Sequence, residues 1–92
     1  MALLIKTNGD KSEVQVPQVG ELEFLQGLVG GMIELAPIMP GAAARPDFDG
    51  VICNEEGKLD GLPVNMVATK FAGYTDDILV GDVLFFKEGE VR

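Results

Sequence analysis

The sequence predicts a small α+β domain: a short antiparallel or mixed β-sheet of three to five strands, with one main amphipathic helix and one short capped helix. Three observations support this prediction. Short apolar or alternating runs are bounded by turn residues, one stretch has helical spacing, and residues 51–69 combine a strand end, a polar turn and a helix cap. The 92 residues contain no linker or repeat, so we expect a single domain over residues 1–92.

Two runs near the N-terminus predict a β-hairpin. Residues 2–5 are apolar, and residues 13–16 alternate between polar and apolar as a half-buried strand does. Asn8-Gly9-Asp10 lies between them and is a strong turn signal. We therefore expect strands over 2–5 and 13–16, with Pro17 ending the second.

Residues 21–29 have the spacing of an amphipathic helix. Leu22, Leu25 and Val29 fall on one face, and the pair of glycines at 30 and 31 is a typical helix end. Nine residues are too few for a stable isolated helix, so this apolar face should pack on the sheet. Further strands are expected over 32–36 and 83–86, and residues 87–92 form a charged tail without a packing signal.

Residues 51–69 hold the densest group of polar and turn-forming residues. Residues 51–53 suit a buried strand end, and residues 54–57 predict a tight acidic turn. Lys58 and Leu59 are expected to begin a short return strand. Asn65 is well placed as the N-cap of a helix over 66–71.

Composition restricts the possible functions. Fifteen acidic and seven basic residues give a net charge of −8, which argues against binding a nucleic-acid backbone or an anionic membrane. The chain has no histidine, which removes the commonest general base and metal ligand. Its one cysteine, Cys53, rules out an internal disulfide and is expected in the core. We expect a cytoplasmic protein that is not an enzyme and needs no cofactor.

Several motifs resemble a family of phage-borne proteins known as domain of unknown function three-eight-four-six. They are Val29-Gly30-Gly31 followed by Ile33-Glu34, Asn54-Glu55-Glu56-Gly57-Lys58-Leu59, Gly61-Leu62-Pro63 with Asn65, Ala68-Thr69, and Val80-Gly81-Asp82-Val83. The resemblance extends from about Ala2 to Phe86. It implies a small cytosolic protein of bacteriophages or other mobile elements, and it brings no catalytic residues with it.

The leading hypothesis is a non-catalytic binding protein of phage origin, with counter-defence as one possible role. It would sequester a small anionic, nucleotide-like ligand within a homo-oligomer. The predicted ligand-binding residues are Asn54, Glu55, Lys58, Asn65 and Thr69. Lysine and a helix start would attract the anion, while amide and hydroxyl groups would orient it. The alternative for this stretch is an ordinary solvated turn followed by a self-capped helix.

Two other function classes stay open. An acidic inhibitor or nucleic-acid mimic could bind a host protein through the excess carboxylates. A metal-dependent enzyme could use pairs among the aspartates at 47, 49, 76, 77 and 82, although the sequence fixes no distance between them.

Overall fold

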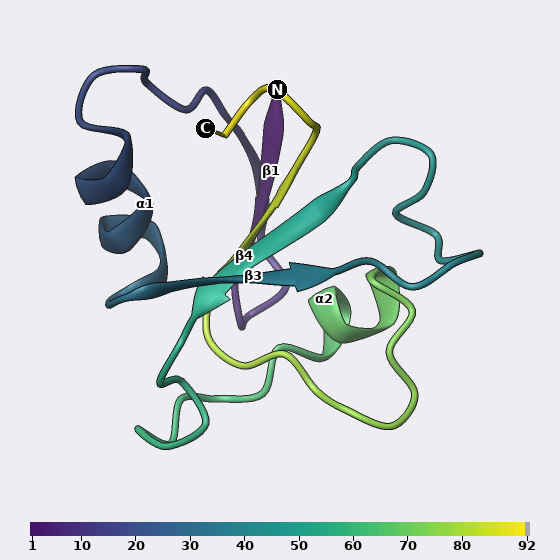
Figure 1. The fold of residues 1–92 in the computed structure, drawn as a ribbon. Coiled ribbons are helices and arrows are strands. Elements are labelled where there is room, and N and C mark those ends of the chain that lie inside the picture. The colour runs from purple at the N-terminus through teal and green to yellow at the C-terminus, as the bar shows by residue number, and fades with distance from the viewer. Residues whose placement is uncertain (92) are drawn as a thin grey trace.

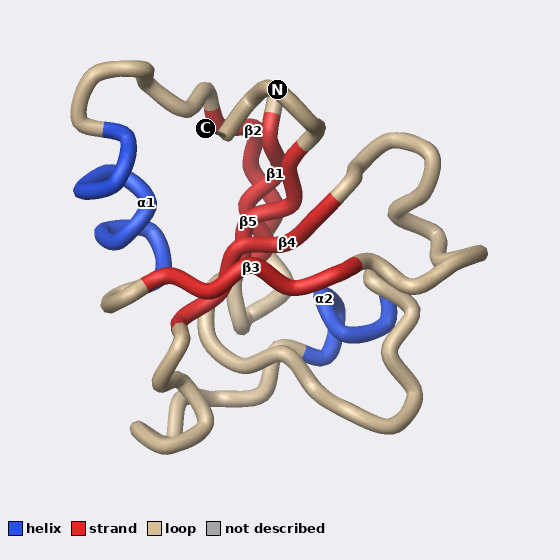
Figure 2. The backbone as a smooth tube through the Cα atoms, viewed as in Figure 1, coloured by secondary structure: helices blue, strands red, loops and turns tan. Residues whose placement is uncertain are grey.

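The computed structural model describes residues 1–91 and contains one five-stranded antiparallel sheet and two short helices (Figures 1 and 2). The elements, in chain order, are β1 (Ala2–Ile5), β2 (Lys11–Val14), α1 (Glu21–Val29), β3 (Ile33–Pro37), β4 (Gly50–Asn54), α2 (Met66–Phe71) and β5 (Val83–Phe86). The strand order is β2-β1-β5-β4-β3. The predicted α+β class is confirmed.

Each face of the sheet is covered by one helix. On the α1 face, Leu25 and Val29 pack with alternate residues of the central strands, such as Ile52 and Leu84. On the α2 face, the small residues of that helix pack with the intervening strand residues and with Ile38 from the loop after β3. Because successive strand residues point to opposite faces, β1, β4 and β5 are apolar along almost their whole length.

Three aromatic rings consolidate the α2 face. Phe71 and Phe85 have ring centroids 5.0 Å apart, and Phe48 meets both rings edge-on at 6.1 and 5.9 Å. These are the separations at which tilted and edge-on aromatic pairs attract one another. The cluster joins α2 to β5 and to the loop before β4.

The helices begin and end where the sequence predicts, and so do the strands over 2–5 and 83–86. The predicted strand over 32–36 is found one residue further on, as β3. The second strand covers Lys11–Val14 rather than 13–16, because the tight loop from Lys6 to Asp10 pairs Ile5 with Lys11. The predicted return strand at Lys58 and Leu59 is wrong. Consecutive turns occupy residues 55–61, and the chain next meets a neighbour at an isolated bridge between Val64 and Val80.

The expectation of an unpacked C-terminal tail is also wrong for the residues that the structure describes. Val91 packs against the α1-face core, and Glu90 forms an ion pair of 3.1 Å with the amino group of Met1. The reason is topological: β1 and β5 are antiparallel neighbours, so the end of β5 emerges beside the N-terminus (Figure 1). The last residue of the predicted tail, Arg92, lies outside the described residues.

Gly73, just after α2, offers a test of this packing. It has a φ of +81°, and a Cβ placed there would lie 2.8 Å from the Cβ of Ala42. Gly30, after α1, has the same φ but no neighbouring atom within 4 Å. We expect Gly30→Ala to lower the free energy of unfolding by about 1 kcal/mol through backbone strain alone. Gly73→Ala should lower the free energy of unfolding by roughly 2–4 kcal/mol, because overpacking against Ala42 adds to the backbone strain.

Urea denaturation of both variants measures the difference. Equal losses at the two glycines would show that the loop after β3 does not pack tightly against the end of α2.

Candidate functional site

A pocket of about 270 Å³ lies between β3, the end of β4 and the segment from Tyr74 to Val80. Its polar lining comes from Glu34, Asn54, Glu55, Lys58, Tyr74 and Asp77. Cys53 and apolar residues, Leu79 and Val80 among them, complete it. Three of the five predicted ligand-binding residues, Asn54, Glu55 and Lys58, therefore lie around one pocket.

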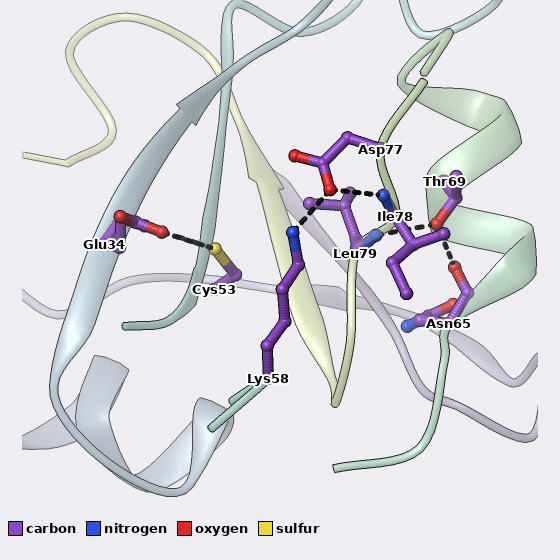
Figure 3. A network of polar contacts seen from close by, with 8 residues as sticks. All are labelled: Glu34, Cys53, Lys58, Asn65, Thr69, Asp77, Ile78 and Leu79. Carbon is purple, nitrogen blue, oxygen red and sulfur yellow. Dashed lines mark hydrogen bonds and ion pairs between the residues drawn. The ribbon is translucent and has the colours of Figure 1, made fainter. Parts of the chain in front are cut away.

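Lys58 and Asp77 both line this pocket and face each other (Figure 3). The two side chains form an ion pair and are 57% and 62% exposed. The hydrogen bond from Lys58, together with one from the backbone N–H of Ile78, lowers the pKa of Asp77. Ion pairs this exposed contribute little to stability. Lys58 is therefore held in position without being sequestered from solvent.

Glu34 and Cys53 face each other on adjacent strands of the pocket (Figure 3). The Cys53 Sγ lies 3.8 Å from the carbonyl oxygen of Glu34 and 3.9 Å from its Oε1. Burial, and then the charge of Glu34 and the hydrogen bond to it, raise the pKa of Cys53 to about 11. The thiol is therefore neutral at physiological pH and is a poor nucleophile.

Tyr74 lines the pocket from the loop after α2. Its hydroxyl donates a hydrogen bond to the carbonyl oxygen of Pro37 at the end of β3. Burial raises the pKa of Tyr74, and so do the thiolate form of Cys53 and the carboxylates of Asp77 and Glu34, so the phenol keeps its proton at physiological pH. Sequence analysis missed both Tyr74 and Glu34. Two features of the sequence could have indicated them: Tyr74 is the only tyrosine of the chain, and Glu34 is a charged residue within an apolar strand.

Asn54 lies at the edge of the pocket and also has a structural role. Its side-chain amide donates to the carbonyl oxygen of Val29 at 3.2 Å, and its Oδ1 accepts from the backbone N–H of Glu56 at 2.9 Å. The first bond ties the end of α1 to β4, and the second shapes the turn. Glu55 differs, because its side chain is exposed and its backbone N–H donates to the carbonyl oxygen of Met32.

Asn65 and Thr69 are buried outside this pocket. Asn65 caps α2, as predicted, by accepting from the Ala68 N–H at 3.1 Å. Its amide also donates to the carbonyl oxygens of Ile5 at 2.8 Å and Gly81 at 2.9 Å. The Thr69 hydroxyl donates to the Asn65 carbonyl at 2.8 Å and accepts from the Leu79 N–H at 2.9 Å. Their polar groups thus bind other parts of the chain.

Three of the aspartates considered for acid–base or metal chemistry have partners that differ from one another. Asp49 accepts from the N–H of Glu88 at 2.7 Å, Asp82 accepts from the N–H of Thr7 at 3.0 Å, and Asp77 pairs with Lys58. Within residues 1–91, no group of three or more His, Cys, Asp or Glu side chains is placed to hold a metal ion.

We expect replacement of Asn65 to destabilise the fold. Asn65→Ala leaves two buried carbonyl oxygens and one N–H without their partners, so the free energy of unfolding should fall by at least about 3 kcal/mol. Asn65→Asp keeps the cap but turns a carboxylate toward the two carbonyls, so it should be at least as damaging at pH 7. The melting temperature of Asn65→Asp should approach that of wild type as pH falls, because a protonated carboxyl group can donate a hydrogen bond to one of the carbonyls.

Thermal melting between pH 4 and 7 checks both variants, with exposed Gln18→Ala as the control. If Asn65→Asp melted at the wild-type temperature at pH 7, the bonds from the Asn65 amide to the carbonyls of Ile5 and Gly81 would not stabilise the fold.

The environment of Cys53 predicts slow alkylation. With a pKa of about 11, the thiol should react with iodoacetamide at pH 8 on the order of a hundredfold more slowly than an unperturbed cysteine. Glu34→Gln removes a charge that raises this pKa, so labelling should accelerate. Mass spectrometry of timed samples gives both rates, and the urea-unfolded chain supplies the reference. Labelling of the native protein at the unfolded rate would contradict this account.

The structure has no helix, over the residues it describes, that is long and apolar enough to cross a membrane. No curated protein and no solved structure matches the chain. A family model described as "Domain of unknown function (DUF3846)" matches residues 1–91. This match covers nearly the entire chain, so the protein belongs to the DUF3846 family.

Proposed function

We propose that this protein is a non-catalytic binding module whose site is the pocket beside β3, and that it takes a small nucleotide-like ligand. The observation that supports this most directly is that Asn54, Glu55 and Lys58 line one pocket together with Tyr74. At about 270 Å³ the pocket lies just below the size range typical of small-molecule sites, which suits a nucleoside or mononucleotide.

The two sides of the pocket suit different parts of such a ligand. The carboxylates of Glu34 and Glu55 can accept hydrogen bonds from amino groups of a base or from ribose hydroxyls. The ring of Tyr74 offers a surface on which a base can stack. Lys58 can exchange its ion pair with Asp77 for one with a phosphate, since an exposed ion pair contributes little to stability.

The chemistry of the lining favours binding over catalysis. Cys53 and Tyr74 are held in their neutral, protonated forms, and Asp77 is the partner of Lys58. The pocket lining includes no histidine, because the chain has none. A bound nucleotide would thus meet hydrogen-bond acceptors and one cation, with no activated nucleophile beside it.

Phage origin, a cytoplasmic location and a counter-defence role complete the proposal, and their support is the family resemblance of the sequence. A small protein that holds a nucleotide signal without cleaving it would lower the free concentration of that signal. Mass spectrometry of ligands released from protein purified out of phage-challenged cells tests this role, with protein from unchallenged cells as the control.

A second candidate is an acidic protein-binding inhibitor or nucleic-acid mimic. The observation in its favour is a group of exposed carboxylates on the turn after β4 and the loop after α2, namely Glu55, Glu56, Asp60, Asp76 and Asp77. A basic partner protein would be attracted to such a surface. Mixtures with candidate basic proteins should then form complexes that Glu55→Lys and Glu56→Lys weaken and added salt dissociates.

We expect a panel of nucleosides, nucleotides and cyclic nucleotides to include compounds that raise the melting temperature. For a nucleotide, Lys58→Ala should remove most of the rise, because the phosphate loses its cation. Asp77→Asn should increase the rise, because Lys58 loses its competing partner. Lys70→Ala is the matched control, since this exposed lysine of α2 lies outside the pocket.

Thermal shift measurements at fixed ionic strength provide the comparison. If no compound stabilises the protein, or if Lys58→Ala and Lys70→Ala respond alike, the pocket is not a nucleotide site and the protein-partner proposal replaces it.

A further inference from the structure

The side-chain donors around the pocket beside β3 are already engaged within the chain. These donors are Asn54, Tyr74, Cys53 and Lys58. The amide and the hydroxyl donate to backbone carbonyl oxygens, whereas the thiol and the ammonium group have carboxylate partners. Of the four residues, Lys58 alone is exposed. A ligand would therefore meet one available cation and, among the other polar side chains of the lining, mainly acceptors.

Among the carboxylates of the lining, Glu34 combines a fixed backbone with free acceptor positions. Its backbone lies in β3, paired with Cys53 of β4, and its Oε1 is 3.9 Å from the Cys53 Sγ (Figure 3). No ion pair engages its carboxylate within residues 1–91. Asp77, by contrast, already accepts from Lys58, and Glu55 lies on the turn after β4. Because a carboxylate has about four acceptor positions, Glu34 keeps most of them for a ligand.

Tyr74 is tied to the same strand as Glu34. Its hydroxyl donates to the carbonyl oxygen of Pro37, which is the last residue of β3. A base that stacks on the Tyr74 ring would therefore lie beside the strand that carries the Glu34 carboxylate. Proteins read a base in such a position by hydrogen bonds to its Watson–Crick edge.

We propose that the ligand of this pocket carries a guanine base and that Glu34 selects it. Guanine presents its N1–H and one N–H of its 2-amino group side by side, and the two oxygens of one carboxylate can accept both. The inference rests on the proposed function, because it names the base of the nucleotide that the pocket is proposed to take.

The other common bases match a carboxylate less well. Adenine and cytosine present one amino group beside a ring nitrogen that is itself an acceptor. Uracil has one N–H between two carbonyl oxygens. Each of these bases would bring an acceptor against a carboxylate oxygen, which leaves that oxygen without a donor and adds repulsion. The acceptor-rich lining thus favours the base that has two adjacent donors.

Isothermal titration calorimetry with the monophosphates of guanosine, inosine, adenosine, cytidine and uridine tests the choice of base. The guanosine compound should bind most tightly. The adenosine, cytidine and uridine compounds should bind roughly 5- to 150-fold more weakly, which is the discrimination expected of one bidentate pair. Inosine monophosphate keeps the N1–H but lacks the 2-amino group, so its affinity should be intermediate.

Glu34→Gln tests the selecting residue, because an amide offers one acceptor and one donor in place of two acceptors. Xanthine has a carbonyl oxygen where guanine has the 2-amino group. The variant should therefore bind guanosine monophosphate more weakly than wild type does, and xanthosine monophosphate more tightly. Glu13→Gln is the matched control, since this exposed glutamate of β2 lies outside the pocket, and it should keep both affinities.

Glu55→Gln distinguishes the two glutamates of the pocket and should keep the preference for guanine over xanthine. Circular dichroism should show that all three variants are folded. Equal affinities for the five nucleotides would overturn the assignment of guanine and leave the proposed function intact. A preference that changes in Glu55→Gln, or that Glu34→Gln leaves unchanged, would overturn the role of Glu34. If none of the nucleotides binds, the proposed function fails as well.

Discussion

The structure depends most on the buried side chain of Asn65, which joins three segments that are distant in sequence. It bonds to the end of β1, to the bend before β5 and to the first turn of α2. A six-residue helix has no stability of its own, so its position must come from such contacts. Thr69 extends the network to Leu79, which fixes one wall of the pocket. The network therefore positions the pocket without entering it.

Most elements of the fold could be predicted because their signals are local. The bounds of α1 and α2 follow from the paired glycines after residue 29 and from the cap at Asn65, and both match the structure. The β2 register and the return strand could not be predicted, since they depend on distant or three-dimensional contacts. After Asn54 the chain closes successive turns, with Gly57 donating to Asn54 and Leu62 to Gly57, which leaves no extended segment to pair.

The candidate site was predictable only as a region. Residues 51–69 do supply part of the pocket lining. The sequence alone, however, does not distinguish polar groups that bond within the fold from those that are open to a ligand. Burial separates them: Asn65 and Thr69 have their polar atoms bonded within the fold, whereas Glu55 and Lys58 are exposed. Glu34 and Tyr74 come from β3 and the loop after α2, so only the folded chain brings them beside Lys58.

The distribution of charge around the pocket limits the ligand that it suits. Three carboxylates, Glu34, Glu55 and Asp77, surround a single cation, so a compact multivalent anion would be repelled overall. An uncharged ligand would leave the Lys58–Asp77 pair unchanged. The proposed ligand is therefore elongated, with hydrogen-bond donors at one end and one phosphate at the other. The donors would meet the glutamates, while the phosphate would take Asp77's place on Lys58. This arrangement of acceptors and one cation favours a mononucleotide-like ligand over a compact anion.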